Sequence, residues 1–319
     1  GVAISKVVGI GKDFEAQMKR VQAVSGASAN ELKTLSQQAR DLGASTANTA
    51  SEIAELQENF ARLGFRTDEI IGMTEATQAL AYATGQELGE SAMQVGSTMK
   101  AFQLETAEAA HVTDIFAAAT ASSALNMTTL GDSLTYVAPV ASGLGFSLEE
   151  SVAMLGKLHD NAITGSMAGT QLRKIMLEMG TEGSKLAKKL GGPVKSAEEM
   201  AIAFDKLRKE GFDPVGEGAA LVGKRAVAGF KVLFDNIGNV EDLTDVLNES
   251  SEAFGGLGFA QEQQRIMMDS LQGDLDKFNS ALEGLALDVF DEFKDDLRSA
   301  VQAMTEFISE TDIEDIKRY

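Results

Sequence analysis

His111 and His159 are the only imidazole groups in this chain of 319 residues. Histidine is the commonest general base and a frequent zinc ligand, and either role needs a suitably placed partner. Asp160 follows His159 directly, but neither histidine has a partner at metal-ligand spacing. A metal site would need both histidines to meet in space with further carboxylates. We therefore predict no metal site and expect each histidine to lie on a helix face, solvated or as a minor polar group of the core.

Nucleophilic catalysis has no support in the sequence. The chain has no cysteine, so a disulfide, a thiolate nucleophile and a cysteine-ligated metal are excluded. The G-x-S-x-G and H-E-x-x-H patterns of serine hydrolases and zinc proteases do not occur. We predict no catalytic residue and no cofactor.

Paired acids are the remaining candidates for catalysis, because a glycosidase or lytic transglycosylase can work with carboxylates. The pairs are Glu149-Glu150, Glu198-Glu199 and Asp295-Asp296. A sugar cleft is usually lined with aromatic rings, and this chain has no Trp and only three Tyr. Most of these acids fall where helices should begin, and the helix dipole favours them there.

The segment GAALVGK over residues 218–224 has the glycine and lysine spacing of a Walker A motif. Arg225 stands where magnesium binding requires Ser or Thr. A Gly/Pro loop, not a strand, precedes it. We interpret the segment as a helix N-terminus followed by basic residues.

Charge excludes several partners. The formal net charge is −20 at pH 7. Sequence-independent DNA binding and docking on anionic lipid both rely on Lys and Arg, so we predict neither specific nucleic-acid binding nor membrane contact for this fragment. No run of about 18 apolar residues is present. The chain starts with Gly1, and we expect it to be a piece of a longer protein.

Residues 143–180 carry the clearest local pattern, which predicts two helices joined by a glycine-bearing turn. Ser147 is an N-cap candidate, and Glu150 completes a capping box. Asn161 and Gly165 mark the break, and Ser166 is the predicted cap of the second helix. Gly169 lacks a Cβ, so another helix can approach closely. Gly169→Leu should therefore destabilise the fold, whereas Gly169→Ala should be tolerated far better.

The remaining pattern predicts an all-α fold, a multi-helix bundle of short and medium helices with a long C-terminal helix. Two breaks are expected inside it: Gly43 should end the second helix, and Pro139 should kink or end the helix of residues 128–144. Thr67 is the predicted cap of the fourth helix, and residues 217–236 are predicted to be one helix. Changes in composition divide the chain into a core of residues 1–180, a smaller extension of residues 181–250 and a long helix in residues 251–319.

An apolar stripe runs through the C-terminal region with spacings of three and four residues, typical of a coiled coil with a stutter. It consists of Leu271, Leu275, Phe278, Leu282, Leu285, Val289, Phe293, Leu297, Val301, Met304 and Ile308. Either this stripe packs on the chain's own domain or it associates with copies of itself. Leu and Phe dominate it and β-branched residues are scarce, which does not select a dimer. We favour a trimer.

The amino-acid sequence of the hairpin is informative beyond its pattern of apolar and capping residues. GFSLEESVAMLGKL over 145–158 and GSMAGTQLR over 165–173 closely resemble the core region of phage tail tape measure proteins. ARDLGASTANTASEIA over 39–54 resembles the opening of the same core, and the resemblance fades near residue 235. The positions that carry the match in the hairpin are Gly145, Ser147, Glu149, Glu150, Ala153, Leu155, Gly156, Leu158, Gly165, Ser166, Ala168, Gly169, Thr170, Leu172 and Arg173. One departure is Ala162, where the family commonly has glycine.

The resemblance implies a structural component of a phage virion. Such proteins occupy the tail tube lumen, set tail length during assembly and help the genome to enter the host, and the resemblance implies tail tube and tail-tip proteins as partners. Two alternatives stay open. One is a peptidoglycan-degrading module of a tail-tip protein, and the other is a helical scaffold of a phage-tail-like bacteriocin.

Overall fold

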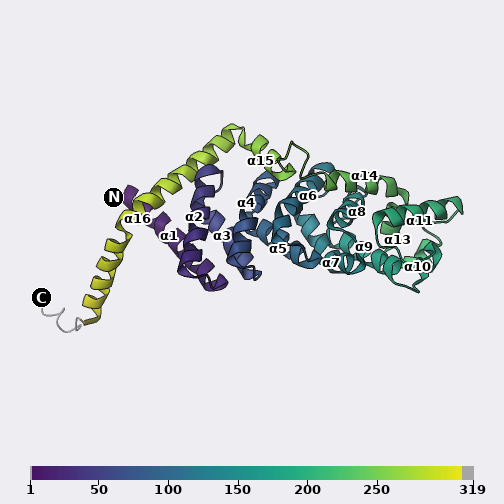
Figure 1. The fold of residues 1–319 in the computed structure, drawn as a ribbon, viewed down its shortest axis with the longest axis horizontal. Helices are drawn as coiled ribbons and strands as arrows, with labels where there is room; N and C mark the ends of the chain where they lie inside the picture. Colours follow the sequence, from purple (N-terminus) through teal and green to yellow (C-terminus); the bar gives the residue numbers. More distant parts are fainter. Residues whose placement is uncertain (1, 311–319) are drawn as a thin grey trace. The chain divides into compact units, whose positions relative to one another are not determined.

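The structure is a computed structural model that describes the backbone of residues 2–310 and the side chains of residues 4–306. It is all-α, as predicted, and the described residues form no strand (Figure 1). The α-helices are α1 Val2–Ser25, α2 Ala29–Ser45, α3 Ala50–Arg62, α4 Thr67–Thr84, α5 Leu88–Phe102, α6 Ala109–Ser122, α7 Met127–Leu144, α8 Leu148–Asp160, α9 Gly165–Gly180, α10 Lys185–Leu190, α11 Ala197–Lys209, α12 Gly218–Val222, α13 Val227–Asp235, α14 Ile237–Asn248, α15 Phe259–Met268 and α16 Leu271–Glu310. A 3-10 turn, Thr106–Glu108, precedes α6.

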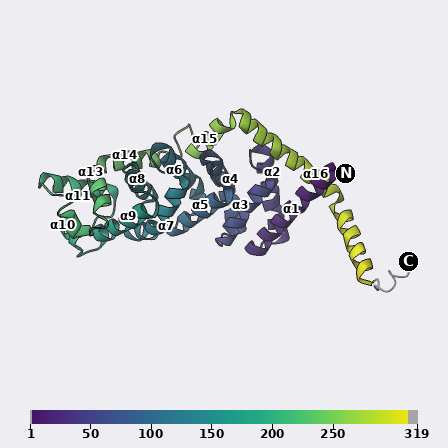
Figure 2. The ribbon, with the colours of Figure 1, turned by 180° about the vertical axis from the view of Figure 1, so that it is seen from behind.

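The chain divides into two compact units. One consists of the residues up to Glu58 together with those from Leu271 on, and the other of Asn59–Ser270. In the first unit, α16 packs against α1 and α2, which lie more than 220 residues earlier in the sequence, since α2 ends at Ser45 and α16 begins at Leu271 (Figures 1 and 2). The terminal segments therefore complete each other's core.

The second unit is a helical bundle whose central pair is α7 and α9. Helix α8 joins these two helices and also packs against α14, while α4 packs against α6 and α15. Its interior combines alanine, with Ala117, Ala118 and Ala119 all at 0% exposure, and a cluster of phenylalanine rings that includes Phe204 and Phe230. Short side chains of the first kind allow helix backbones to approach closely.

Local capping signals explain where several helices begin. Ser28 and Glu31 form a reciprocal capping box at α2, and Thr49 and Glu52 exchange the corresponding bonds at the start of α3. Each pair satisfies two backbone donors that the first turn of a helix leaves open. Each pair consists of residues three positions apart, so these two helix starts follow from the local sequence.

The prediction that Gly43 ends α2 is wrong. The helix continues to Ser45, and Gly43 is buried inside it. A Cβ built on Gly43 would lie 2.6 Å from the backbone nitrogen of Ala50, so the glycine admits the start of α3 and does not break the helix. The start of α4 is also shifted by one residue: Thr67 is its first helical residue, and Arg66 is the N-cap.

Pro139 was predicted to kink or end its helix, and the ending is wrong because α7 continues to Leu144. The missing N–H at Pro139 leaves the carbonyl of Thr135 without its helical donor. Both residues are exposed, so water can satisfy that carbonyl, while the opposite face of α7 packs against α9. The tertiary packing therefore maintains the helix through the proline.

The segment of residues 217–236 forms two helices, α12 and α13, and not one. Gly223 separates them with a φ of +85°. A second break, at Asp269 and Ser270, separates α15 from α16, so the long helix begins only at Leu271. Within residues 2–310 no helix combines the length and the apolar character that crossing a bilayer requires.

Candidate functional site

The turn between α8 and α9 is built around the buried imidazole of His159. Its Nδ1 lies 2.8 Å from the carbonyl oxygen of Leu155, and its Nε2 accepts a hydrogen bond of 3.0 Å from the backbone nitrogen of Gly165. A carbonyl only accepts and an N–H only donates, so these two contacts select the neutral imidazole with its proton on Nδ1. Burial lowers the pKa of His159 below its usual value. The ring thus supports the first backbone N–H of α9.

This contact replaces the cap that the sequence suggests. The prediction that Ser166 caps α9 is wrong, because the helix begins at Gly165 and Ser166 lies in its first turn with its side chain exposed. The N-cap residue, Thr164, makes no side-chain capping bond.

Ala162 occupies the left-handed region in this turn, with a φ of +63°. Its backbone nitrogen donates to the carbonyl of His159 at 2.9 Å, and the nitrogen of Ile163 donates to the carbonyl of Leu158 at 2.9 Å. These bonds close the end of α8 in the manner of a Schellman motif. Such a conformation favours glycine, so the chain forms the expected turn with a residue that is strained there.

Helices α9 and α7 cross closely where Gly169 faces Ser133. A Cβ built on Gly169 would lie 2.3 Å from the carbonyl oxygen of Ser133 and 2.9 Å from its Cα and carbonyl carbon. The hydroxyl of Ser133 is 2.8 Å from the carbonyl oxygen of Gly165, one turn earlier in α9. The close approach that the sequence suggests is present, but it is tighter than expected. Because even a methyl group meets backbone atoms, the expectation that alanine is tolerated at Gly169 is wrong.

Glu150 accepts hydrogen bonds from the N-termini of both α8 and α11. Ser147 and Glu150 form the predicted capping box, with the backbone nitrogen of Ser147 2.9 Å from Glu150 Oε2. The other oxygen, Oε1, accepts a bond of 2.6 Å from the backbone nitrogen of Ala197, the first residue of α11. One carboxylate thus serves the N-termini of two helices, a structural role that needs no catalysis.

The other residues of the matching segments lie at a helix end, at a helix contact or on the exposed surface. Gly145 ends α7 with a φ of +95°. Gly156 lies at the contact of α8 with α14, where an added Cβ would be 3.0 Å from Leu243 Cδ2. Thr170 and Arg173 are exposed on α9, and nothing in the structure explains them.

A polar cluster that the sequence does not reveal surrounds His111 on α6. Its Nε2 lies 2.7 Å from Glu149 Oε1, and its Nδ1 lies 2.8 Å from Ser251 Oγ. The bond to Glu149 raises the pKa of His111 above its usual value. Burial works to raise the pKa of Glu149, but hydrogen bonds, chiefly from His111, outweigh it and leave that pKa lowered. The two partners lie 38 and 140 positions from His111, so no local spacing could have identified them.

A hydroxyl, an imidazole and a carboxylate are the groups of a hydrolase triad, but here the direction of the hydrogen bond between histidine and serine is reversed. A triad needs a neutral histidine that accepts the proton of serine. Nε2 of His111 bonds Glu149, Nδ1 bonds Ser251 Oγ, and Asp114 bonds the same hydroxyl, so when Ser251 donates its one proton to Asp114 the imidazole is the donor on both sides. Burial raises the pKa of Asp114. The cluster therefore holds the segment around Ser251 against α6 and α8.

No other arrangement among the described residues points to a metal or a nucleotide. No group of three or more His, Asp or Glu in the part of the chain that the structure describes could hold a metal ion. The Walker-like segment forms the short helix α12 and a turn at Gly223, while Gly218 packs 3.1 Å, measured from its added Cβ, from the ring of Phe230. Its backbone therefore belongs to a helix packing surface and not to a phosphate-binding loop.

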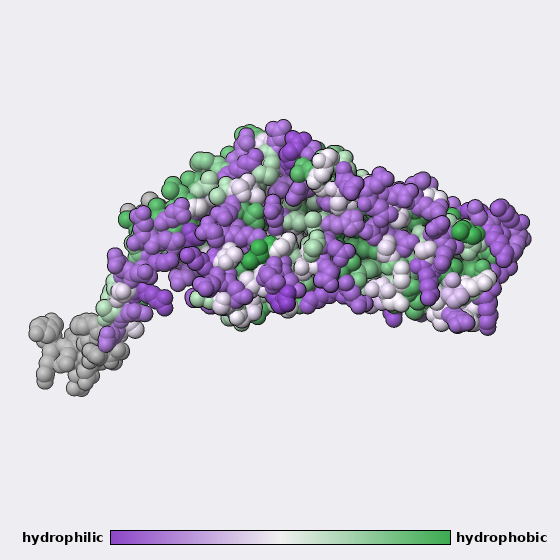
Figure 3. Space-filling model, in the orientation of Figure 1, coloured by the Kyte–Doolittle hydropathy of each residue, from purple (hydrophilic) through white to green (hydrophobic). Residues whose placement is uncertain are grey.

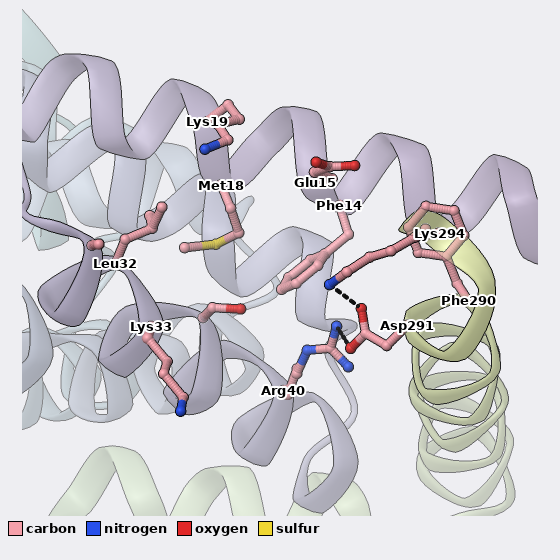
Figure 4. A pocket seen from close by; sticks show the side chains of 13 residues that line it. Phe14, Glu15, Met18, Lys19, Leu32, Lys33, Arg40, Phe290, Asp291 and Lys294 are labelled. Atoms are coloured by element: carbon pink, nitrogen blue, oxygen red, sulfur yellow. Dashed lines mark hydrogen bonds and ion pairs between the residues drawn. The ribbon is translucent and has the colours of Figure 1, made fainter. Parts of the chain in front are cut away.

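A pocket of about 250 Å³ lies between α1, α2 and α16 (Figure 4). Phe14, Met18 and Phe290 contribute its apolar surface. At one side, Asp291 accepts a bond of 2.8 Å from Arg40 and one of 2.9 Å from Lys294. The guanidinium of Arg40 also lies 5.2 Å from the centre of the Phe14 ring. These contacts fasten α16 to the first two helices, and the volume is below that of typical ligand pockets.

One face of α16 exposes a row of large apolar side chains. Its apolar side chains from Leu271 to Val289 are between 41% and 76% exposed, whereas Ser280 and Leu287 on the opposite face are buried against the same unit. Hydrophobic colour follows the ridge that α16 forms in Figure 3. The described part of the stripe thus leaves its first heptads unpacked. Further along, Val301 and Met304 are also exposed, and the side chain of Ile308 lies outside the described residues.

Comparison with known proteins gives a consistent result. A family model described as phage-related minor tail protein matches residues 36–288, so the similarity extends well past residue 235, where the resemblance in the sequence was expected to fade. A tape measure protein of Pneumococcus phage Dp-1 is 32% identical over 94% of this chain and 27% of its own length. A probable tape measure protein of Escherichia phage P2 is 31% identical over 95% of this chain and 38% of its own length. No solved structure matches the chain.

Proposed function

The chain belongs to the phage-related minor tail protein family, and from this premise we propose that it is the helical core of a tape measure protein. The observation that carries the proposal is the identity above 30% to two proteins of that name along nearly the whole chain. The chain spans about a third of the length of these relatives. Its proposed role is therefore that of one region within a longer protein.

The geometry supports a structural role. The residues that match the family form caps, turns and close helix crossings. They include the capping box of Ser147 and Glu150, the start of α9 at Gly165, and Gly169 where it meets Ser133. Around His111, where residue types of a hydrolase triad meet, the hydrogen bond to Glu149 raises the pKa of the imidazole and so favours its charged form. A scaffold is thus the better interpretation than a peptidoglycan-degrading module.

In the proposed role the chain is part of the virion, in the tail tube lumen or at the tail tip, and it contacts tail tube and tail-tip proteins. Setting tail length and assisting the entry of the genome into the host are the activities proposed for the parent protein. The division into a core of residues 1–180, an extension of residues 181–250 and an association segment of residues 251–319 is part of the same proposal.

We also propose self-association, with a trimer as the favoured state. The exposed apolar face of α16 supports this, because a soluble monomer seldom exposes a row of large apolar side chains. Sedimentation of the whole chain over a range of concentrations tests it. A single monomeric species at every concentration would contradict self-association while leaving the family assignment intact.

Tail morphology tests the main proposal. A phage that carries the parent gene would be complemented with that gene bearing Gly169→Leu, which disrupts the crossing of α9 with α7. We expect few infectious particles and tails of abnormal length or number in electron micrographs. Gly72→Ala is the matched control, since an added Cβ there meets nothing within 4 Å. Normal tails of normal length with the Gly169→Leu gene would contradict a tape measure role for this region.

A further inference from the structure

We infer that α16 associates with the α16 of a second copy of this chain in parallel and in register, through the face from Leu271 to Val289. The inference rests on the self-association proposed above and adds its surface, its partner and its direction. Helix α16 is suited to this role because it has two separate packing faces. One face is used within the chain, and the other has no cover within the residues that the structure describes.

The heptad pattern separates these two faces. Leu275, Leu282 and Val289 fall at one core position of a heptad, and Leu271, Phe278 and Leu285 at the other, with alternating spacings of four and three. The position farthest from such a seam is occupied by Gly273, Ser280 and Leu287, and all three are buried in the chain's own unit. In a coiled coil this position normally faces water. Intramolecular packing therefore takes the outer face of α16 and leaves the seam free.

The spacing also selects the partner. Knobs-into-holes packing over these heptads needs a second helix with the same repeat over a similar length. The other large apolar side chains exposed on the helices of the described structure are mostly isolated, such as Met93, Tyr136 and Ile202 on three different helices. Among described helices only α16 itself offers a matching stripe, so a second copy of α16 is the occupant that the pattern specifies.

The residues beside the seam select the direction. In an antiparallel pair that aligns all six apolar residues, Leu275 faces Leu285 of the partner copy, and Asp274 comes beside Asp288 at both ends. Like charges at such positions repel, although Arg40 lies 3.4 Å from Asp288 and offsets part of its charge. In a parallel pair, Asp274 comes beside Asn279 instead. The parallel arrangement thus removes both acid pairs.

Disulfide trapping tests the direction, because the chain has no cysteine of its own. The probes are the full chain with Leu275→Cys and the full chain with Leu285→Cys, each oxidised alone and as a mixture. In register and parallel, each substituted position faces its own copy, within the reach of about 7 Å that a disulfide allows. In the antiparallel alignment, position 275 of one copy is about 15 Å along the axis from position 275 of the other, and only the mixture can link. Lys277→Cys, which points away from the seam, is the matched control.

We expect each variant alone to form about tenfold more linked dimer than the Lys277→Cys control. Linkage only in the mixture would overturn the parallel direction while self-association stands. An oligomer in sedimentation that gives no linkage at either position, or linkage equal to the control, would show that another surface mediates it. Monomers in sedimentation would refute self-association itself.

Discussion

Gly169 and Ser133 place α9 and α7 in backbone contact, since a Cβ on Gly169 would lie 2.3 Å from the carbonyl oxygen of Ser133. Neither backbone can move without shifting a whole helix, so Gly169→Ala should lower the free energy of unfolding by about 3 kcal/mol or more. Urea denaturation followed by circular dichroism measures this loss. Gly72→Ala, in open space on the exposed side of α4, should instead raise stability by about 0.5–1 kcal/mol. Equal effects of the two substitutions would contradict the close crossing.

Ala162→Gly should stabilise the chain. The left-handed conformation costs a residue with a Cβ about 1–2 kcal/mol, and the greater freedom of glycine in the unfolded state offsets about 0.4–1 kcal/mol of the gain. We expect a net increase of roughly 0.5–1 kcal/mol in the free energy of unfolding. Thermal and urea denaturation measure it, and a clear loss of stability would show that Ala162 is not held at positive φ.

The pairing of His111 with Glu149 should make the free energy of unfolding depend on pH above 6.5. Because the pKa of His111 is raised in the folded state, its stabilising contribution is complete below the ordinary value of 6.5 and is lost as pH rises through the raised pKa. Glu149→Gln should bring the pKa of His111 down and flatten this dependence. NMR titration of the imidazole resonances, which come from only two histidines, measures the pKa directly. A pKa of His111 at or below 6.5 in the unsubstituted chain would refute the charged cluster.

His159 should have the opposite effect. Burial lowers its pKa in the folded state, so the unfolded chain takes up the proton first and stability falls as pH drops below 6.5 toward the lowered pKa. His159→Gln keeps a polar side chain but removes the titration, and it should abolish this part of the acid sensitivity. Unfolding measured from pH 7 to pH 5 tests the prediction. An unchanged slope in the variant would exclude His159 as its source.

Ser280→Ala should stabilise the packing of α16 on its own unit. The Ser280 hydroxyl is 1% exposed and has no hydrogen-bond partner among the described residues. An unsatisfied buried polar group costs about 1–3 kcal/mol, so its removal should raise the free energy of unfolding by about 1 kcal/mol. Because Ser280 faces away from the proposed seam, the variant should leave sedimentation unchanged. A shift in oligomeric state would show that this face takes part in association.

Local signals were sufficient where the chemistry is local. The capping box of Ser147 and Glu150 depends on residues three positions apart, and the sequence predicts it. The crossing at Gly169 was predictable in kind, because a glycine inside a helix of apolar residues indicates close packing. Its tightness was not, since it depends on where α7 lies.

Features that depend on tertiary contacts could not be predicted from the sequence. Pro139 remains inside a helix because the carbonyl of Thr135, which it leaves without a donor, lies on the exposed side of α7, while the other side is packed. Ser166 loses the capping role to an imidazole that folds back from the preceding helix. The His111 cluster brings together residues from three distant segments. No periodic pattern in the sequence indicates that these residues are in contact.

The order of the two units along the chain determines how the molecule responds to force. Residues 59–270 are inserted between the two segments that form the other unit, so both ends of the inserted unit are anchored in it. A pull between α1 and α16 is then borne by the contacts that these helices share, including the packing of Leu287 and Phe290. The inserted bundle carries no tension until those contacts separate. Under load the terminal helices therefore part first, and the inserted bundle begins to extend only afterwards.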